Sequence, residues 1–252
     1  MNKRKALCRW CEENTDLIRA HIIPRNFYNA VKDDTKVAIL LRPQQSKYTE
    51  VSQSGIFDPG ILCAKCDNLL GDLDNYGFQV FEKRPTDANL VFDQDGMPVG
   101  YDLHCDDVQK AQKFILSMLW RASITTHDFF DAVSLGAVNE DAIRGLIVAG
   151  TNVTEEAFEF ILIHQFDHPY IGGMMPPTTS RIDGILIYNF YLPFFKIIIR
   201  MDKRRLGFPF TVGHFRDKAS PQCLRMPYAD SPESAYMRGL AVALRAREQA
   251  ED

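Results

Sequence analysis

Cysteine is scarce in this chain, with six residues among 252, and this scarcity excludes a disulfide-rich secreted scaffold. A general excess of basic charge is also absent, because the formal net charge is −4 at pH 7. The chain is therefore not a uniformly basic nucleic-acid-binding protein, and any such role has to rest on a local patch. Hydrophobic residues make up 46% and charged residues 25%, as in ordinary globular proteins.

A long uninterrupted apolar run is the third feature that the sequence lacks. The longest candidate, residues 185–199, is broken by Asn189, Pro193 and Lys196, whereas a membrane-spanning helix needs about 20 predominantly apolar residues. The first residues after Met1 are basic and are not followed by the apolar segment of a secretory signal peptide. We therefore expect a cytoplasmic protein without a membrane partner, in which cysteine thiols stay reduced.

The charge that is present is distributed unevenly along the chain. Residues 1–84 contain 13 Lys and Arg against 11 Asp and Glu, a balance of +2, whereas the remaining residues contain 16 against 22, a balance of −6. Phosphate groups attract cations. We therefore expect a nucleic-acid site, if the chain has one, in the N-terminal part.

Four of the six cysteines form two pairs with the same two-residue gap, Cys8 with Cys11 and Cys63 with Cys66. This gap lets two thiolates bind one tetrahedral zinc ion, and two such pairs complete a four-thiolate site, which is structural rather than catalytic. The pairs are 51 residues apart, and the second directly precedes a predicted helix. The spacing predicts a zinc-braced unit in which a hairpin packs against that helix.

The rest of the chain predicts an α+β fold, with a small zinc-braced ββα-metal, treble-clef-like unit followed by a larger mixed α/β domain. We place the zinc-binding unit at residues 1–84, a linker at residues 85–104 and the second domain at residues 105–252. The turn signal Asp95-Gly96-Met97-Pro98 supports the linker. The unpaired Cys105 and Cys223 are expected to be buried free thiols.

Periodic patterns predict the main elements of the second domain. Apolar residues at helical spacing predict a helix from about Asp106 to Thr126. Trp120 and Arg121 lie on this helix, and we expect them to pack or to form a cation–π contact rather than to act in catalysis. Apolar runs predict strands over 182–191 and 194–201. Residues 156–166 could form a helix or a strand, and their alternating apolar residues favour a strand.

The segment between the cysteine pairs carries a recognisable motif. A histidine lies in the context of residues 20–24, Ala-His-Ile-Ile-Pro; Asp58 precedes the second pair, and Asp67 and Asn68 directly follow it. This arrangement resembles the HNH family of endonucleases, the ββα-metal group, which has a first histidine, a middle asparagine and a final histidine or asparagine at these places. The resemblance covers residues 6–80, about a third of the chain.

The resemblance implies a hydrolase that cleaves phosphodiester bonds in DNA. His21 would be the general base that accepts a proton from the attacking water, and Asp58 would orient its ring. A catalytic Mg²⁺ or Mn²⁺ ion would neutralise charge on the scissile phosphate and the leaving oxygen. Asp67 is the expected protein ligand of this ion, with Asn68 or Asp72 assisting.

Three cations near the motif, Arg19, Arg25 and Lys65, are expected to contact phosphates. One residue departs from the family pattern: Ala20 stands where family members usually have a metal-binding aspartate. An alternative interpretation follows, in which the unit is catalytically degenerate and its zinc module binds nucleic acid or a protein partner.

Expectations about partners follow from the same resemblance. A homodimer is one, because cleavage of both DNA strands with one site per chain is simplest in a pair. A protein partner for residues 105–252 is another. Chains that join an HNH unit to an unfamiliar domain are often effectors of bacterial restriction or anti-phage defence systems, which gives an expected biological setting.

Overall fold

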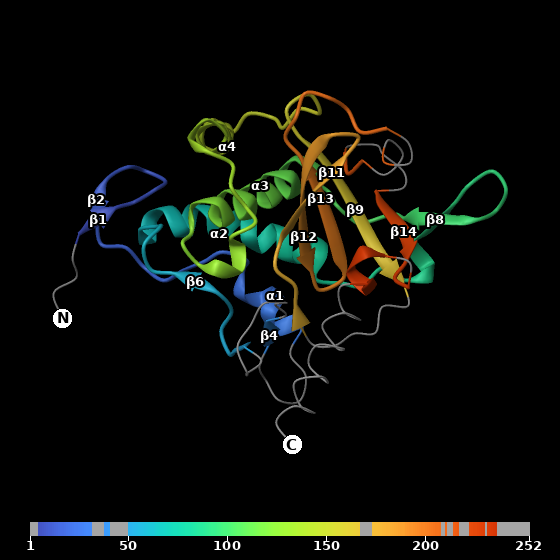
Figure 1. The fold of residues 1–252 in the computed structure, drawn as a ribbon, viewed down its shortest axis with the longest axis horizontal. Helices are drawn as coiled ribbons and strands as arrows, with labels where there is room; N and C mark the ends of the chain where they lie inside the picture. Colours follow the sequence, from blue (N-terminus) through green and yellow to red (C-terminus); the bar gives the residue numbers. More distant parts are fainter. Residues whose placement is uncertain are drawn as a thin grey trace, which may run out of the picture.

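The computed structural model describes residues 5–31, 38–40, 50–166, 173–207, 210, 214–216, 222–229 and 231–235. The fold is α+β: long helices lie against one side of a large sheet, and short strands near the N-terminus extend to one end (Figure 1). The described helices are α1 (Arg25–Ala30), α2 (Ala64–Phe81), α3 (Val108–Ile124) and α4 (Ala137–Ala149), with 3-10 turns at Asp87–Asn89 and Asp128–Phe130.

The N-terminal region contains several very short strands. β1 pairs antiparallel with β2, and β3 pairs antiparallel with β6; each of these strands has two residues. A third small sheet has the order β10-β4-β5. The bounds are β1 Ala6–Leu7, β2 Asn14–Thr15, β3 Ala20–His21, β4 Ala38–Leu40, β5 Glu50–Ser52, β6 Phe57–Asp58 and β10 Gly173–Met174.

The large sheet has seven described strands in the order β11-β12-β13-β9-β14-β8-β7. Its neighbours pair antiparallel except β14 and β9, which are parallel. The bounds are β7 Leu90–Phe92, β8 Pro98–Tyr101, β9 Glu159–Phe166, β11 Thr178–Ile182, β12 Ile185–Leu192, β13 Phe195–Arg200 and β14 Cys223–Pro227. The strands expected over 156–166, 182–191 and 194–201 are thus confirmed as β9, β12 and β13.

The central strands bury apolar residues on both faces because side chains alternate along a strand. In β9, Phe160 and Leu162 join the main hydrophobic cluster, whereas Ile161 and Ile163 join a smaller cluster. The main cluster also includes apolar residues of α2 and α3, so these helices cover that face of the sheet. Strands buried on both faces read as continuous apolar runs, which is how they look in the sequence.

Helices α2 and α3 pack closely against each other. α3 starts at Asp107, whose side chain accepts a hydrogen bond from the Lys110 N–H at 2.8 Å, a standard N-terminal cap. Gly77 of α2 lies under the ring of Phe114, since a Cβ at this position would come within 2.2 Å of that ring. Gly71, by contrast, has open space around it. The helix predicted over residues 106–126 is confirmed as α3.

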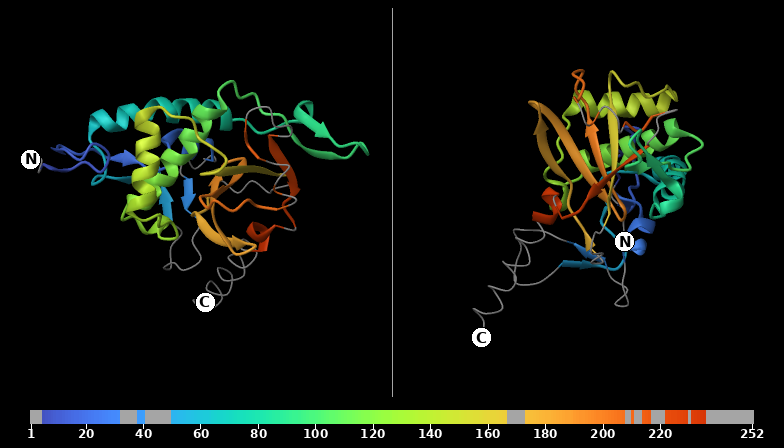
Figure 2. Two further views of the ribbon diagram at one scale, coloured as in Figure 1. Left: turned by 90° about the horizontal axis from the view of Figure 1, so that it is seen from above. Right: turned by 90° about the vertical axis from the view of Figure 1, so that its right-hand side faces the viewer.

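The segment predicted as a linker is part of the large sheet. β7 and β8 form an antiparallel hairpin at its edge, and the predicted turn over residues 95–98 lies in that hairpin. This hairpin and the β1–β2 hairpin lie at opposite ends of the molecule (Figure 2). One hydrophobic cluster joins Trp10 and Leu70 to Phe114 and Phe195, so the two predicted domains share a core.

Among the helices of the described residues, none combines the length and apolar character that crossing a membrane requires.

Candidate functional site

Four cysteine side chains from the two predicted pairs converge on one point. The sulfur atoms of Cys8, Cys11, Cys63 and Cys66 all lie within 4.8 Å of one another. Zinc bound tetrahedrally by thiolates at about 2.3 Å needs its sulfurs about 3.8 Å apart, so the cluster fits such an ion. The spacing-based prediction that these four residues form one site able to hold a metal such as zinc is confirmed.

Local backbone geometry builds this cluster. The chain turns back after the first pair at Glu12, which has a positive φ of 61° and donates its N–H to the Cys8 carbonyl at 2.9 Å. The second pair lies at the start of α2, and the Cys63 N–H points at the Cys8 sulfur at 3.4 Å. Backbone N–H groups and a helix N-terminus both favour thiolates.

The thiols influence one another strongly. Burial would raise the pKa of Cys8, but backbone N–H groups, including that of Cys63, outweigh it and lower this pKa to about 7. Burial and the neighbouring sulfurs raise the pKa of Cys66. Four crowded thiols cannot all ionise without a cation between them, which is the electrostatic reason that a metal ion suits this cluster.

The candidate general base, His21, lies on β3, opposite Phe57 of β6. The two rings meet edge-on with centroids 6.2 Å apart. His21 Nε2 lies 2.8 Å from the Ser54 carbonyl oxygen. A carbonyl oxygen only accepts hydrogen bonds, so Nε2 carries the proton and, in the neutral ring, Nδ1 keeps its lone pair. The half-buried ring can therefore accept a proton at Nδ1.

Asp58 does not perform the predicted role of orienting His21. Its side chain accepts hydrogen bonds from the Gly60 N–H at 2.7 Å, the Thr125 hydroxyl at 2.7 Å and the Thr126 N–H at 3.3 Å. Asp58 is paired with Ala20 across the two-stranded sheet of β3 and β6, and successive side chains of a strand point to opposite faces. Asp58 therefore faces away from His21 and anchors β6, while the Ser54 carbonyl holds the imidazole.

Asp67, the expected ligand of the catalytic ion, lies in the first turn of α2. Burial raises its pKa and Asp74 adds to the rise, whereas the charges of Arg121 and His21 oppose it. Asp67 is thus within electrostatic reach of His21 and of Arg121, which donates a hydrogen bond to the His21 carbonyl at 3.0 Å.

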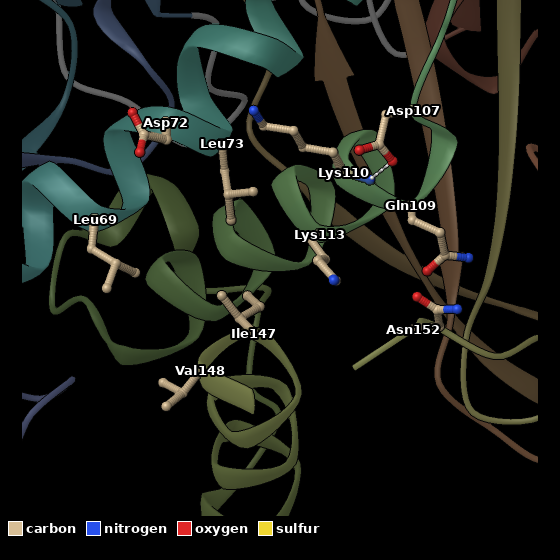
Figure 3. Close-up of a pocket in the computed structure, with 10 residues that line it drawn as sticks. All are labelled: Leu69, Asp72, Leu73, Asp107, Gln109, Lys110, Lys113, Ile147, Val148 and Asn152. Carbon is tan, nitrogen blue, oxygen red and sulfur yellow. Dashed lines mark hydrogen bonds between the residues drawn. The ribbon is translucent and has the colours of Figure 1, made fainter. Parts of the chain in front are cut away.

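Asn68 and Asp72 lie on another face of α2. Asp67 and Asp74 are seven residues apart and share a face, whereas Asn68 and Asp72 are turned away from Asp67 by roughly 100° to 140° at 3.6 residues per turn. Asp72 lines a hollow of about 590 Å³ between α2, α3 and the end of α4 (Figure 3). The predicted ligand set is therefore divided between two faces of one helix.

Among the described residues, no group of three His, Cys, Asp or Glu ligand atoms other than the cysteine cluster lies close enough together to hold a metal ion. Among the described residues near His21, Asp67 is the carboxylate that the sequence selects, and the nearby Asp74 is already paired with Arg121. Mg²⁺ is often bound through one or two carboxylates with waters and substrate phosphates. The surroundings of His21 and Asp67, called the His21 corner below, fit such an ion only if a phosphate supplies further ligands.

The three predicted phosphate-binding cations are all exposed. The Arg19 guanidinium lies 3.4 Å from the centroid of the Phe57 ring, the ring that His21 also contacts. Arg25 is the first residue of α1, and Lys65 lies in the first turn of α2. Arg19 is therefore the cation most clearly tied to the His21 corner.

Arg121 and Asp74 belong to this corner, although neither was selected from the sequence. Arg121 is buried on α3; its Nη1 donates to the His21 carbonyl at 3.0 Å and to Asp74 Oδ2 at 2.9 Å. The expected packing role falls to Trp120, whose ring meets that of Trp10 edge-on at 4.8 Å. Arg121 is instead hydrogen-bonded to the segment that carries the candidate base.

Comparison of the chain with protein-family models, with curated proteins and with solved structures finds no significant match.

Proposed function

We propose that this chain is a metal-dependent DNA endonuclease of the HNH type, with His21 as the general base and a structural zinc ion at the four cysteines. One observation carries the proposal. The Nε2–H of His21 is fixed on the Ser54 carbonyl, so Nδ1 is the proton acceptor. The strand that carries this ring pairs with β6, whose chain leads into the cysteine pair at the start of α2.

The chemistry asked of the protein is modest. His21 Nδ1 would accept the proton of a water that attacks the scissile phosphorus, and histidine suits this task because imidazole titrates near neutral pH. Asp67 would hold a Mg²⁺ or Mn²⁺ ion together with waters and an oxygen of the phosphate. When bound, the ion supplies neutralisation of charge on the phosphate and the leaving oxygen.

The exposed cations provide the expected contacts to the DNA backbone. Arg19, stacked on Phe57, would place a phosphate beside the imidazole, and Arg25 and Lys65 would extend the contact on either side. Such contacts supply affinity and position but no sequence preference. DNA binding should therefore weaken steeply as salt is raised.

The test is cleavage of supercoiled plasmid by zinc-loaded protein with Mg²⁺ or Mn²⁺. We expect His21→Ala to lower the rate at least about 100-fold, the usual minimum for a general base. His104→Ala is the matched control, because His104 is exposed in a connecting segment, and it should cut like the wild type. Equal cutting by both variants, or no cutting by the wild type under any metal condition, would contradict the proposal.

A second function is favoured by Ala20. This residue is fully buried, and it cannot bind a metal ion where family members carry an aspartate. A non-catalytic module that binds nucleic acid through Arg19 and its neighbours would share the same structure. It predicts salt-dependent DNA binding without cleavage, and metal-dependent turnover that disappears in His21→Ala would exclude it.

A further inference from the structure

Arg121 is a charged residue in an unusual place. It is 1% exposed, and it lies near the C-terminal end of α3. Burying a guanidinium is costly unless every donor has a partner. The hydrogen-bond partners of Arg121 therefore indicate the role of its buried charge.

All five N–H donors of this guanidinium are used. Within α3, Nε donates to the Ser117 carbonyl and Nη2 to the Ser117 hydroxyl, each at 3.2 Å. Nη1 donates to Asp74 Oδ2 at 2.9 Å and Nη2 donates to Asp74 Oδ1 at 2.5 Å, and Asp74 lies on α2. The remaining Nη1 donor reaches the His21 carbonyl on β3 at 3.0 Å. One planar group thus joins α3, α2 and the strand that carries the candidate base.

A second set of hydrogen bonds holds β6, the strand that pairs with β3. Thr125, directly after α3, donates its hydroxyl to Asp58 Oδ2 at 2.7 Å, and the Thr126 N–H adds a bond at 3.3 Å. β3 is therefore attached to α3 through Arg121, and β6 is attached through Thr125. Two strands of two residues each have too few hydrogen bonds to hold a fixed position by themselves, and the bonds to α3 and to the residues directly after it supply this support.

We propose that Arg121 is a positioning residue of the His21 site, which holds the His21 backbone at a fixed place relative to α2. This inference rests on the proposed nuclease function. It extends the catalytic unit to α3, beyond residue 80, where the family resemblance ends. Stability alone does not explain the buried charge, because replacing a whole buried ion pair by apolar residues of similar volume often leaves stability unchanged.

The competing explanation is that Arg121 only stabilises the core, and the substitution Arg121→Lys separates the two. Lysine can keep an ion pair with Asp74, but its single ammonium group lacks the planar fork that reaches both Asp74 and the His21 carbonyl. We expect Arg121→Lys to retain most stability and bound zinc, yet to lower kcat about 10- to 100-fold with KM unchanged. Misplacing a reacting group by about 1 Å costs up to about 100-fold.

Arg144→Met is the matched control. Arg144 also donates to a backbone carbonyl in the N-terminal region, that of Trp10 at 3.0 Å, but it has no contact with His21. This variant should keep kcat. Equal losses of kcat in Arg121→Lys and Arg144→Met would overturn the proposal, as would full kcat in Arg121→Lys.

An activity-independent readout separates this inference from the nuclease proposal. Nitrogen NMR of histidine-labelled, zinc-loaded protein should show His21 in the Nε2–H tautomer in the wild type and a mixture of tautomers in Arg121→Lys, with His104 unchanged as internal reference. Thr125→Val, which keeps the side-chain shape but loses the donor, should shift the His21 signals in the same direction by less. If His21 is unaffected in both folded variants, the inference is wrong, whether or not the wild type cleaves DNA.

Discussion

The N-terminal region and the large sheet are held together in different ways. Strands β1, β2, β3 and β6 have two residues each, far fewer than an independently stable sheet needs. The sheet has strands of up to eight residues that bury aliphatic side chains on both faces. The candidate site therefore lies in the region that depends on outside support, from the cysteine cluster and from α3.

Removing the metal should have the largest effect, and only on the N-terminal region. Metal binding contributes on the order of 10 kcal/mol to the folding of small zinc modules. We expect Cys63→Ser to lose zinc and to abolish hydrogen-exchange protection around β3 and β6, while β9 and β13 stay protected. Cys105→Ser is the control, because Cys105 lies outside the cluster and contacts Tyr76. Full zinc binding and unchanged protection in Cys63→Ser would show that the N-terminal region does not depend on the cysteine cluster.

The reverse experiment destabilises the sheet and leaves the metal in place. Glu159 is 2% exposed and is paired with the fully buried Arg200. Removing one partner of such a pair leaves an uncompensated charge, so Glu159→Gln should lower the free energy of unfolding by about 3–5 kcal/mol in urea titrations. Zinc content should not change. Asp202→Asn, which breaks an exposed pair with Arg204, should have little effect, and equal effects would contradict this account.

The contact between the two regions can be tested with two glycines of α2. Gly77→Ala would push a methyl group into the Phe114 ring, and such overpacking costs about 1–3 kcal/mol. Gly71→Ala meets no atom within 4 Å and should stabilise the helix by about 0.5–1 kcal/mol. Thermal unfolding should move in opposite directions. A shift of the same sign would mean that α2 and α3 do not pack as described.

The smallest effect concerns a buried carboxylate near the ends of three interior strands, β9, β12 and β13, and depends on pH. Glu233 is buried and accepts hydrogen bonds from Lys196 at 2.7 Å, Gln165 at 2.7 Å and Tyr191 at 3.0 Å. Burial would raise the pKa of Glu233, but the Lys196 charge and these hydrogen bonds outweigh it and lower the pKa. The folded state therefore favours the ionised carboxylate.

A lowered folded-state pKa contributes stability above the unfolded value of about 4.3, and this contribution is lost as pH falls through the folded value. The wild type should be more stable than Glu233→Gln at pH 7. The difference should shrink below about pH 4.3, by no more than about 1.4 kcal/mol per pH unit for one proton. A difference that stays constant down to pH 2.5 would show that Glu233 acts only through packing.

Features with a short-range physical cause were predictable from the sequence. A two-residue gap already sets the ligand geometry of each cysteine pair, so the cluster of four followed from spacing. Helix α3 and strands β9, β12 and β13 followed from periodicity. The hairpin of β7 and β8 was assigned to a linker because the turn signal over residues 95–98 does not say whether its flanking segments pair with a sheet.

The missed parts of the site depend on distant partners. Arg121 bonds a carbonyl 100 residues away and a carboxylate 47 residues away, which no local pattern reveals. Asp67, Asn68 and Asp72 were grouped because they are close in sequence, yet the helical period separates them. The period of 3.6 residues per turn places Asp74 on the same face of α2 as Asp67. This is the one sequence signal that points to the hydrogen bonds between Asp74, Arg121 and the His21 carbonyl.

We propose that the chain has two separate metal sites, one closed at the cysteines and one open at His21. Paramagnetic broadening of NMR signals by Mn²⁺, added to zinc-loaded protein with a short DNA duplex, tests this claim. We expect the signals of His21 and Asp67 to broaden first, with recovery on addition of excess Mg²⁺ and with zinc still bound. Sharp His21 and Asp67 signals at millimolar Mn²⁺ would contradict the claim.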